Sequence, residues 1–157
     1  MSTKTPSAIR AADCPKREGS RYPSPHNEPC MARSKAILGD VFGLDQFGVN
    51  LATLAPGAWS SQRHWHVNED EFIYVLVGNI TLCDDAGEHL LTPGMCAGFK
   101  ANNGNGHCLK NLTDEPVQYL EVGTRTLNET AWYSDIDMKA EIVNHRAKFI
   151  KKDGSSF

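Results

Sequence analysis

The sequence predicts an all-β fold, an antiparallel sandwich or barrel, from two observations. After about residue 40 the chain consists of short apolar runs, and each run ends at a turn residue such as Gly, Pro, Asn or Asp. No stretch of ten or more residues between these runs carries a helical period, so strand is expected to follow strand without crossover helices. The sequence also lacks internal repeats and low-complexity segments. One antiparallel β-domain is therefore expected.

The expected strands can be placed by the turns that end them. The first covers residues 47–54 and stops at a Pro-Gly pair, and a long one covers residues 71–77 and stops at Gly78. Strands of this length and spacing are typical of small antiparallel β-proteins. Only residues 137–148 are expected to hold a short helix. The remaining expected strands cover residues 80–83, 89–91, 108–109 and 117–122.

The first 35 residues differ in amino-acid composition from the rest of the chain. They are rich in Pro, Ser, Arg and Asn, and each proline biases its predecessor toward extended conformations. An extended arm is expected there, and Tyr22 suggests that part of it docks on the rest. We therefore divide the chain into an extended N-terminal arm (residues 1–35), a β-barrel (residues 36–125) and a C-terminal extension (residues 126–157) that packs on or near the barrel.

Composition narrows the class of protein. The 157 residues can close one core without disulfides, and five cysteines without CxxC spacing favour free thiols in a reducing compartment. The first ten residues lack the apolar core of a secretion signal, and no segment approaches membrane-spanning length. A net charge of -3 provides no basic field for nucleic acid and no polybasic patch for a membrane. We expect a cytoplasmic protein that binds a small molecule, and neither nucleic acid nor membrane.

A cluster of histidines carries the chemical information. His64 and His66 are two residues apart, so in a strand their side chains share one face. After a short turn the next strand begins with Glu71, and His107 on a later strand can supply a fourth ligand. Three imidazole nitrogens and one carboxylate oxygen suit Mn, Fe, Co, Ni, Cu or Zn and leave coordination positions open. We predict one divalent metal ion per chain, of undetermined identity.

Each member of this set has a simpler explanation when it is taken alone. A lone His-x-His pair is often two polar residues on a solvated face, and His107 alone is more often a hydrogen-bonded core histidine. Their combination within a small antiparallel barrel favours a metal site. Of the neighbouring acids, Asp70 is the alternative carboxylate ligand and Glu69 is expected to be solvated. The other histidines lack such company and are expected at the surface: His26, His89 and His145.

At these residues the sequence resembles the cupin superfamily over about residues 51–123. The first cupin motif is matched by His64, His66, Glu71 and Gly78. The second is matched by Gly87, Pro93, Gly94, His107 and Asn111, with a long stretch before the histidine. The resemblance implies a double-stranded β-helix, or jelly roll. It also implies that the metal ligands are His64, His66, Glu71 and His107.

Two classes of function remain open. The first is a metal-dependent enzyme that acts on a small polar molecule, by dioxygenase-type or by sugar-phosphate isomerase or lyase chemistry. Tyr119 and Glu121 share one strand face and would supply a proton shuttle, unless that face points outward. Gln62 and the loop over residues 102–105 are candidates for polar recognition. The alternative is a non-catalytic cupin that binds or senses a small ligand. Catalytic residues stay unassigned.

An apolar band predicts a homodimer. In the 71–77 strand, three residues share the face of Glu71 and are expected to fill the barrel: Ile73, Val75 and Val77. The others are expected to point outward, with Trp65 on the neighbouring strand: Phe72, Tyr74 and Leu76. An exposed band of this kind is unusual for a monomer. It is covered either by the N-terminal arm or by a second subunit.

Overall fold

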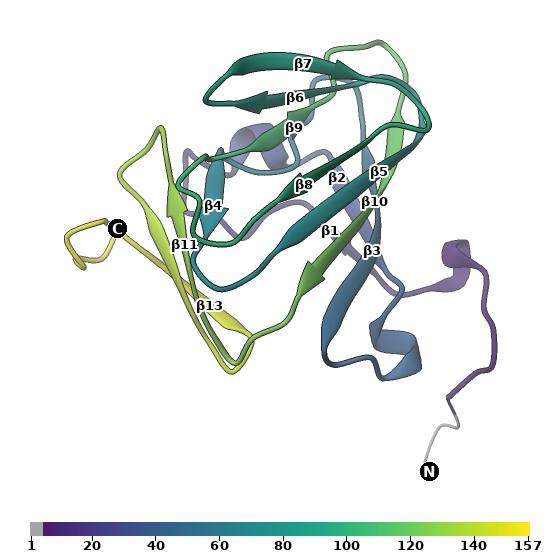
Figure 1. Cartoon of the computed structure of the whole chain (residues 1–157), viewed down its shortest axis with the longest axis horizontal. Coiled ribbons are helices and arrows are strands. Elements are labelled where there is room, and N and C mark those ends of the chain that lie inside the picture. The colour runs from purple at the N-terminus through teal and green to yellow at the C-terminus, as the bar shows by residue number, and fades with distance from the viewer. Residues whose placement is uncertain (1–4) are drawn as a thin grey trace.

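Antiparallel strands make up nearly all the regular structure in residues 5–157, the part of the chain that the computed structural model describes (Figure 1). The only helices in this range are three single turns of 3₁₀ helix, Ala11–Asp13, Glu28–Cys30 and Asp40–Phe42. None of these turns has the length or the apolar character to cross a membrane. The prediction of an all-β antiparallel fold is confirmed.

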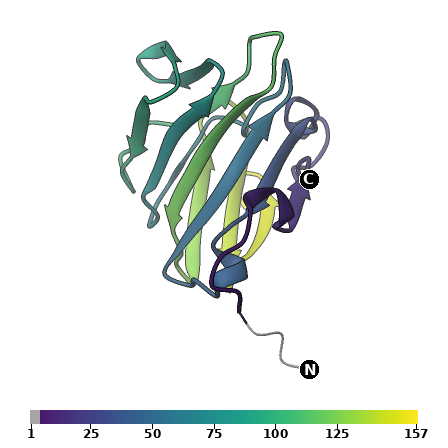
Figure 2. The same cartoon turned by 90° about the vertical axis from the view of Figure 1, so that its right-hand side faces the viewer.

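The strands form three sheets. The largest has the order β1-β2-β3-β10-β5-β8, with bounds Lys16–Glu18, Arg33–Ile37, Phe47–Leu54, Val117–Thr124, Glu71–Val77 and Cys96–Phe99. The second has the order β13-β12-β11-β4, with bounds Arg146–Ile150, Lys139–Val143, Asn128–Tyr133 and His64–His66. The third has the order β7-β6-β9, with bounds Gly87–Leu91, Ile80–Asp84 and Cys108–Lys110. In Figure 2 the second sheet lies behind the large one, so the two faces enclose the interior of a jelly roll.

The core lies between the inner faces of these sheets. Leu54, Val75, Val117 and Tyr119 are almost completely buried there, and burying an aliphatic side chain of this size contributes roughly 1.5–3 kcal/mol. The turn at Gly78, which ends β5, has φ +75°, and a Cβ added to it would lie 2.7 Å from Val117 Cγ1. That position therefore requires glycine.

The second-motif asparagine has a structural role. Asn111 is fully buried, and its amide Nδ2 donates to the carbonyl oxygens of Leu54 (3.0 Å) and Glu115 (2.8 Å). Its Oδ1 accepts from the backbone N–H (3.0 Å) and the hydroxyl (2.7 Å) of Thr113. Because every polar group of this side chain has a partner, Asn111 ties the turn before β10 to the end of β3.

The helix expected over residues 137–148 is wrong. That segment forms the hairpin of β12 and β13, joined by the two-residue turn Asn144-His145. Both turn residues have positive φ, 49° and 63°, as in the turns whose twist matches that of antiparallel strands. Ala140 and Ile150 are buried, and this hairpin forms the outer half of the four-stranded sheet.

The N-terminal segment contacts both large sheets. Strand β1 pairs with β2 at the edge of the six-stranded sheet, with Lys16 opposite Ala36. Tyr22 packs edge-on against Tyr133 and Phe149 of the four-stranded sheet, at ring-centroid distances of 5.5 and 5.2 Å. The expected docking of Tyr22 is therefore confirmed. Residues 1–4 of the predicted arm lie outside the described residues.

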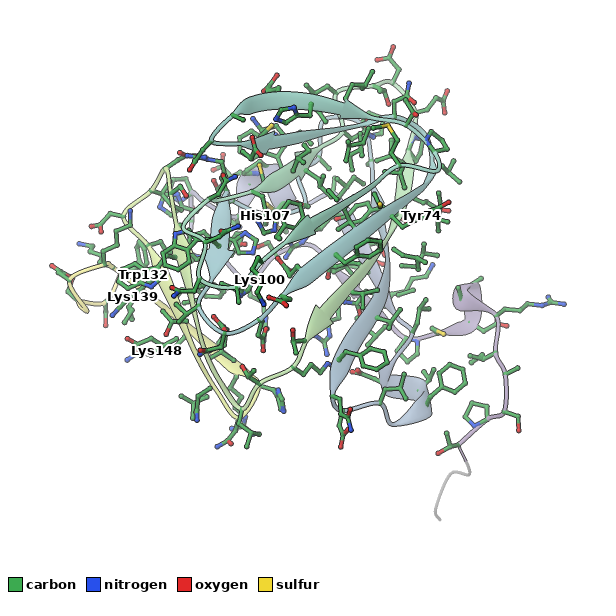
Figure 3. All side chains as sticks on the ribbon, in the orientation of Figure 1. Tyr74, Lys100, His107, Trp132, Lys139 and Lys148 are labelled. Atoms are coloured by element: carbon green, nitrogen blue, oxygen red, sulfur yellow. The ribbon has the colours of Figure 1, made fainter. Side chains whose placement is uncertain are left out.

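The apolar band differs from the prediction in two ways. Phe72, Tyr74 and Leu76 are exposed on the large sheet as expected, but Val77 is exposed as well instead of filling the core. Trp65 belongs to the other sheet, because the chain crosses from β4 to β5 and does not form a hairpin between them. There it stacks on Trp132, with ring centroids 6.5 Å apart. Figure 3 shows Tyr74 and Trp132 on these separate sheets.

Candidate metal centre

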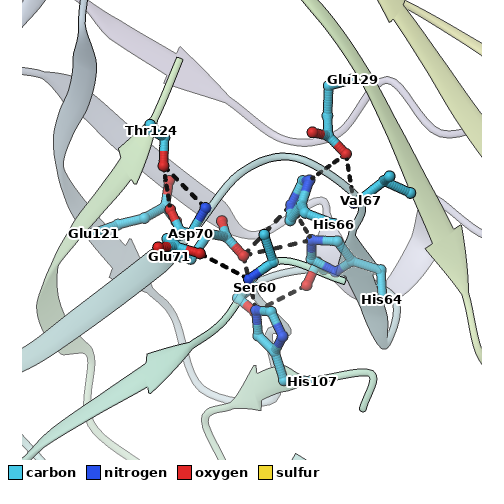
Figure 4. Close-up of polar contacts among 12 residues, drawn as sticks. Ser60, His64, His66, Val67, Asp70, Glu71, His107, Glu121, Thr124 and Glu129 are labelled. Carbon is cyan, nitrogen blue, oxygen red and sulfur yellow. Dashed lines mark hydrogen bonds and ion pairs between the residues drawn. The ribbon is translucent and has the colours of Figure 1, made fainter. Parts of the chain in front are cut away.

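Three elements bring the four predicted ligands into one cavity. His64 and His66 lie on β4, Glu71 is the first residue of β5, and His107 directly precedes β9. His64 and His107 exchange both backbone hydrogen bonds, N to O distances 3.1 and 2.8 Å, so their rings lie side by side with centroids 5.0 Å apart. The His107 side chain is buried and points into this cavity, not to the barrel exterior (Figure 4).

The ligand atoms converge on the Glu71 carboxylate. One Oε atom of Glu71 lies 2.9 Å from His107 Nε2, 3.4 Å from His66 Nε2 and 3.9 Å from His64 Nε2. The Nε2 atoms of His64 and His66 are 3.1 Å apart. Metal–ligand bonds of about 2.0–2.2 Å place two ligands of one cation roughly 2.8 to 4.4 Å apart, depending on the angle between the bonds. The donor types of His64, His66 and Glu71, and the distances among them, therefore fit one divalent cation.

The four residues do not contribute equally to this fit. Ligand atoms of His64, His66 and Glu71 all lie within 4.8 Å of one another. His107 joins this group through its hydrogen bond to Glu71. A cation held by all four would take the place of that hydrogen bond.

The local electrostatics keep His64 neutral and Glu71 ionised, whereas His66 holds a proton at neutral pH that a cation would have to displace. Burial, together with His66 and His107, lowers the pKa of His64 to about 3. Burial also lowers the pKa of His66, but Glu71 and Glu129 more than offset this effect and raise it to about 8. Burial raises the pKa of Glu71, but His66 and His107 outweigh it and hold the pKa below its usual range. A neutral His64 and an ionised Glu71 are the forms that bind metal.

Packing fixes the orientation of each imidazole ring. His64 Nδ1 is 2.9 Å from the carbonyl oxygen of Gln62, and the ring stacks on Tyr133 at 5.6 Å. The His107 ring lies flat on Phe99, with centroids 3.5 Å apart. Rings held in this way keep their orientation, with Nε2 of His64 and of His107 toward the Glu71 carboxylate.

Glu129 on β11 is a member of the site that the sequence analysis missed. Its carboxylate lies 3.7 Å from His66 Nδ1 and accepts backbone N–H groups of Val67 (2.7 Å), Asn68 (2.8 Å) and Thr130 (2.8 Å). The side chain of Glu129 is fully buried. At 3.7 Å its contact with His66 is an ion pair and not a hydrogen bond, since His66 Nδ1 has no hydrogen-bond partner among the described residues. A carboxylate behind a ligating histidine favours the tautomer that is protonated on the side facing it. The signal in the sequence was a glutamate on the same alternating face as the buried Ala131 and Tyr133.

The acidic turn after His66 behaves differently from the prediction. Glu69 is half-buried, because its carboxylate accepts the backbone N–H (2.7 Å) and the hydroxyl (3.0 Å) of Thr126. The expectation that it is solvated is therefore wrong. Asp70, the alternative ligand, is exposed and binds Lys100 Nζ at 2.9 Å and the N–H of Ala101 at 2.8 Å.

The cavity around the cluster has a volume of about 250 Å³ and includes Tyr119 and Glu121 in its wall. The face that these two residues share on β10 therefore points inward. Tyr119 is 1% exposed, and its hydroxyl has no hydrogen-bond partner among the described residues. Burial raises the pKa of Tyr119 well above its usual value, so the hydroxyl stays protonated. The Glu121 carboxylate accepts from Lys35 Nζ at 2.7 and 2.8 Å and from Asn50 Nδ2 at 3.1 Å.

The polar groups expected to recognise a ligand are engaged elsewhere. Gln62 Nε2 donates to the carbonyl oxygen of His26 at 2.8 Å, and Gln62 is not part of the cavity wall. Asn105 in the 102–105 loop accepts the N–H of Asp85 at 2.9 Å. His89 and His145 are exposed as expected, whereas His26 is half-buried.

Comparison with known proteins agrees with this architecture. Residues 50–123 match the family model described as Cupin domain. A crystal structure from Silicibacter pomeroyi, described as a sugar phosphate isomerase from a cupin superfamily, is 47% identical over 96% of both chains, with a TM-score of 0.92. One from Acidithiobacillus ferrooxidans, provisionally described as a sugar phosphate isomerase, is 26% identical over 80% of both chains, with a TM-score of 0.72.

A more distant structure shares the fold alone. The polyketide cyclase RemF from Streptomyces resistomycificus is 21% identical over 74% of this chain and 78% of its own, with a TM-score of 0.62. No curated protein matches the sequence. Since the Silicibacter pomeroyi relative is nearly half identical along almost the whole length of both chains, this chain belongs to the cupin superfamily.

Proposed function

We propose that the protein is a metal-dependent isomerase that interconverts a small hydroxyaldehyde and the corresponding hydroxyketone, as in sugar phosphates. One observation carries this proposal: Tyr119 and Glu121 line the same cavity as the four candidate metal ligands. The description of the Silicibacter pomeroyi relative as a sugar phosphate isomerase supports it.

This reaction moves protons and needs no oxidant or reductant. A base removes the proton from the hydroxyl-bearing carbon next to the carbonyl and returns it to the former carbonyl carbon. The hydroxyl proton moves to the former carbonyl oxygen, so atoms and electrons balance. A bound divalent cation would polarise the carbonyl and lower the cost of the first step. The protein must then supply a proton acceptor within reach of the two adjacent carbons and a hydrogen-bond donor beside the substrate oxygen.

Glu121 and Tyr119 match these two roles. Lys35 and Asn50 hold the Glu121 carboxylate in one orientation at the cavity wall, which suits a group that accepts a proton from carbon. Two residues away on the same face, Tyr119 carries an uncommitted hydroxyl whose raised pKa keeps it protonated. It therefore serves as a hydrogen-bond donor that stabilises the charge developing on the substrate oxygen.

The other candidate functions would use the same ligands in a different way. A dioxygenase would use the open metal positions for oxygen and would not depend on a proton-transfer pair. A ligand-sensing cupin would bind without turnover. Because Tyr119 and Glu121 line the same cavity as the cluster, we favour the isomerase over both alternatives.

The test is to incubate the metal-loaded protein with pentose and hexose phosphates in deuterated water and follow the products by proton NMR. We expect isomerisation without oxygen uptake, and solvent deuterium on the carbon that receives the proton. Glu121→Gln should lower kcat by roughly 10²- to 10⁴-fold without loss of metal. Glu141→Gln is the matched control, since Glu141 also pairs with a lysine (Lys139, 2.9 Å) but outside the cavity. Substrate loss with oxygen consumption, or tight binding without turnover, would contradict the proposal.

A further inference from the structure

The N-terminal segment and β2 bring three cations to the cavity. Arg21, Arg33 and Lys35 line both the cavity that holds the cluster and an adjoining outer hollow of about 640 Å³. Arg17, Glu18 and His145 border the outer hollow only, and the Glu18 carboxylate accepts from the Ser34 hydroxyl at 2.9 Å. The three shared residues therefore stand where the interior meets the outer hollow.

The charges of these cations are not equally compensated. Lys35 is paired with Glu121 at 2.7 Å, so that pair is neutral overall. Arg33 donates from Nε to the carbonyl oxygen of Gly19 at 2.9 Å and from Nη1 to the carbonyl oxygen of Ser60. Within residues 5–157 no carboxylate forms an ion pair with Arg33 or with Arg21. Two positive charges at this end of the cavity therefore lack a negative partner.

Three contacts hold the Arg33 guanidinium in a fixed position. Its two carbonyl contacts come from different segments, and its guanidinium carbon lies 5.9 Å from the centre of the Tyr22 ring. Neither contact uses Nη2, whose two N–H donors remain for another acceptor. A half-buried guanidinium held by neutral carbonyls keeps its full charge and its directional donors. That combination suits a tetrahedral oxyanion.

We propose that Arg33 and Arg21 form the binding site for the phosphate group of a phosphorylated substrate. A phosphate monoester carries a charge of about -1.5 to -2 at neutral pH, which balances the two free cations. The rest of the substrate then extends into the cavity toward Tyr119, Glu121 and the His-Glu cluster. The identity of that remainder rests on the proposed function, whereas the anion site follows from the uncompensated charge.

Calorimetric titration with inorganic phosphate tests this site on the full-length, metal-loaded protein. We expect binding that weakens with added salt, and Arg33→Gln should weaken it by about tenfold or more, as expected when a charged hydrogen-bond donor is lost. Arg21→Gln should weaken it to a smaller extent. Lys148→Gln is the matched control, an exposed cation that borders neither hollow, and it should leave the affinity unchanged.

Further controls distinguish phosphate binding at this site from binding at the metal. His66→Ala should keep phosphate binding, because the histidine cluster is not part of the anion site. Acetate should bind about tenfold or more weakly than phosphate, having one charge and fewer acceptors. Circular dichroism checks the fold, and if Arg33→Gln does not fold, the exposed Arg21→Gln carries the test.

Distinct results would overturn the two proposals. Phosphate affinity that is unchanged in the arginine variants, or lost only in His66→Ala, would show that the anion binds elsewhere and overturn the phosphate site. Acetate binding as tightly as phosphate would overturn the phosphate assignment. Intact phosphate binding without turnover of any sugar phosphate would uphold the anion site and count against the isomerase alone.

Discussion

The two ends of the cavity are built in different ways. At one end, three of the four candidate ligands come from an eight-residue stretch, His64 to Glu71, on strands that pack against the core. At the other end, Arg21 and Arg33 come from the N-terminal segment and β2, and the cavity brings them together with residues such as Tyr119 that lie far along the chain. The metal end is therefore local in sequence and lies on paired strands, whereas the proposed recognition end, formed by Arg21 and Arg33, depends on how the N-terminal segment docks.

The largest expected effect is the loss of metal binding when one histidine ligand is removed. His66→Ala should abolish metal binding, because it removes a nitrogen that lies within 3.4 Å of both His64 Nε2 and the Glu71 carboxylate. The barrel should stay folded, since no core cluster includes this residue. Metal content after gel filtration, measured by atomic absorption, checks the first expectation and circular dichroism the second. Stoichiometric metal in the folded variant would contradict this account of the metal end.

A smaller loss of metal affinity is expected when His66 remains but the Glu129 carboxylate behind it is removed. Glu129→Ala should weaken metal binding by about 10- to 100-fold, because His66 loses the carboxylate that favours its Nδ1-protonated tautomer. It should also lower the free energy of unfolding by about 1–3 kcal/mol or more, since buried N–H groups lose their acceptor. Metal titration and urea unfolding measure the two effects, with Glu141→Ala as the exposed control. Unchanged metal affinity together with lower stability would mean that Glu129 only holds the turn.

The recognition end can be disturbed while the ligands stay in place. Tyr22→Ala removes edge-on packing on Tyr133 and Phe149, and each aromatic pair contributes about 0.5–1.5 kcal/mol beyond its buried area. We expect a loosened N-terminal segment, a higher KM for a phosphorylated substrate and an unchanged metal affinity. Steady-state kinetics beside a metal titration measures this split. A loss of metal affinity equal to the rise in KM would show that the two ends are not separable.

The smallest effect on the cavity is expected from the outer face of β5. The homodimer inferred from the exposed residues Phe72, Tyr74 and Leu76 stays a prediction. Light scattering should give the mass of a dimer, and a stable interface should bury about 1,000 Å² or more. Leu76→Asp should then shift the mass toward the monomer while metal binding is retained. A monomeric wild-type protein would remove this prediction and leave the cavity comparison unaffected.

The sequence predicted most where the pattern was local. The 71–77 strand and the His-x-His pair follow from a two-residue period, and the structure bears out both the strand and the common cavity of the ligands. The 137–148 hairpin was missed because its turn is Asn144-His145, which lacks the glycine that usually marks such turns. The prediction that Trp65 lies on the strand next to residues 71–77 is wrong because the short turn after His66 leads to a different sheet.

The site residues that the sequence could not predict are those brought together by pairing between strands that are distant in the sequence. Glu129 supports His66 only because β11 pairs with β4, with Ala131 opposite His66. Arg33 reaches the cavity because β2 pairs with β3, and its carbonyl contact at Ser60 lies 27 residues further along the chain. A periodic pattern within one segment cannot predict such contacts. At these positions the structure identifies site residues that the sequence motif does not include.

The metal site and the phosphate site are tested most directly by a crystal structure of the metal-loaded protein with phosphate, measured at the absorption edge of the bound metal. We expect one anomalous peak at about 2.0–2.2 Å from Nε2 of His64, His66 and His107 and from a Glu71 oxygen. Phosphate should lie against Arg33 at the other end of the same cavity. His66, Glu69 and Glu129 form a second group of closely spaced ligand atoms. A peak at that group instead, or a His107 ring that stays hydrogen-bonded to Glu71 away from the ion, would contradict the four-ligand site.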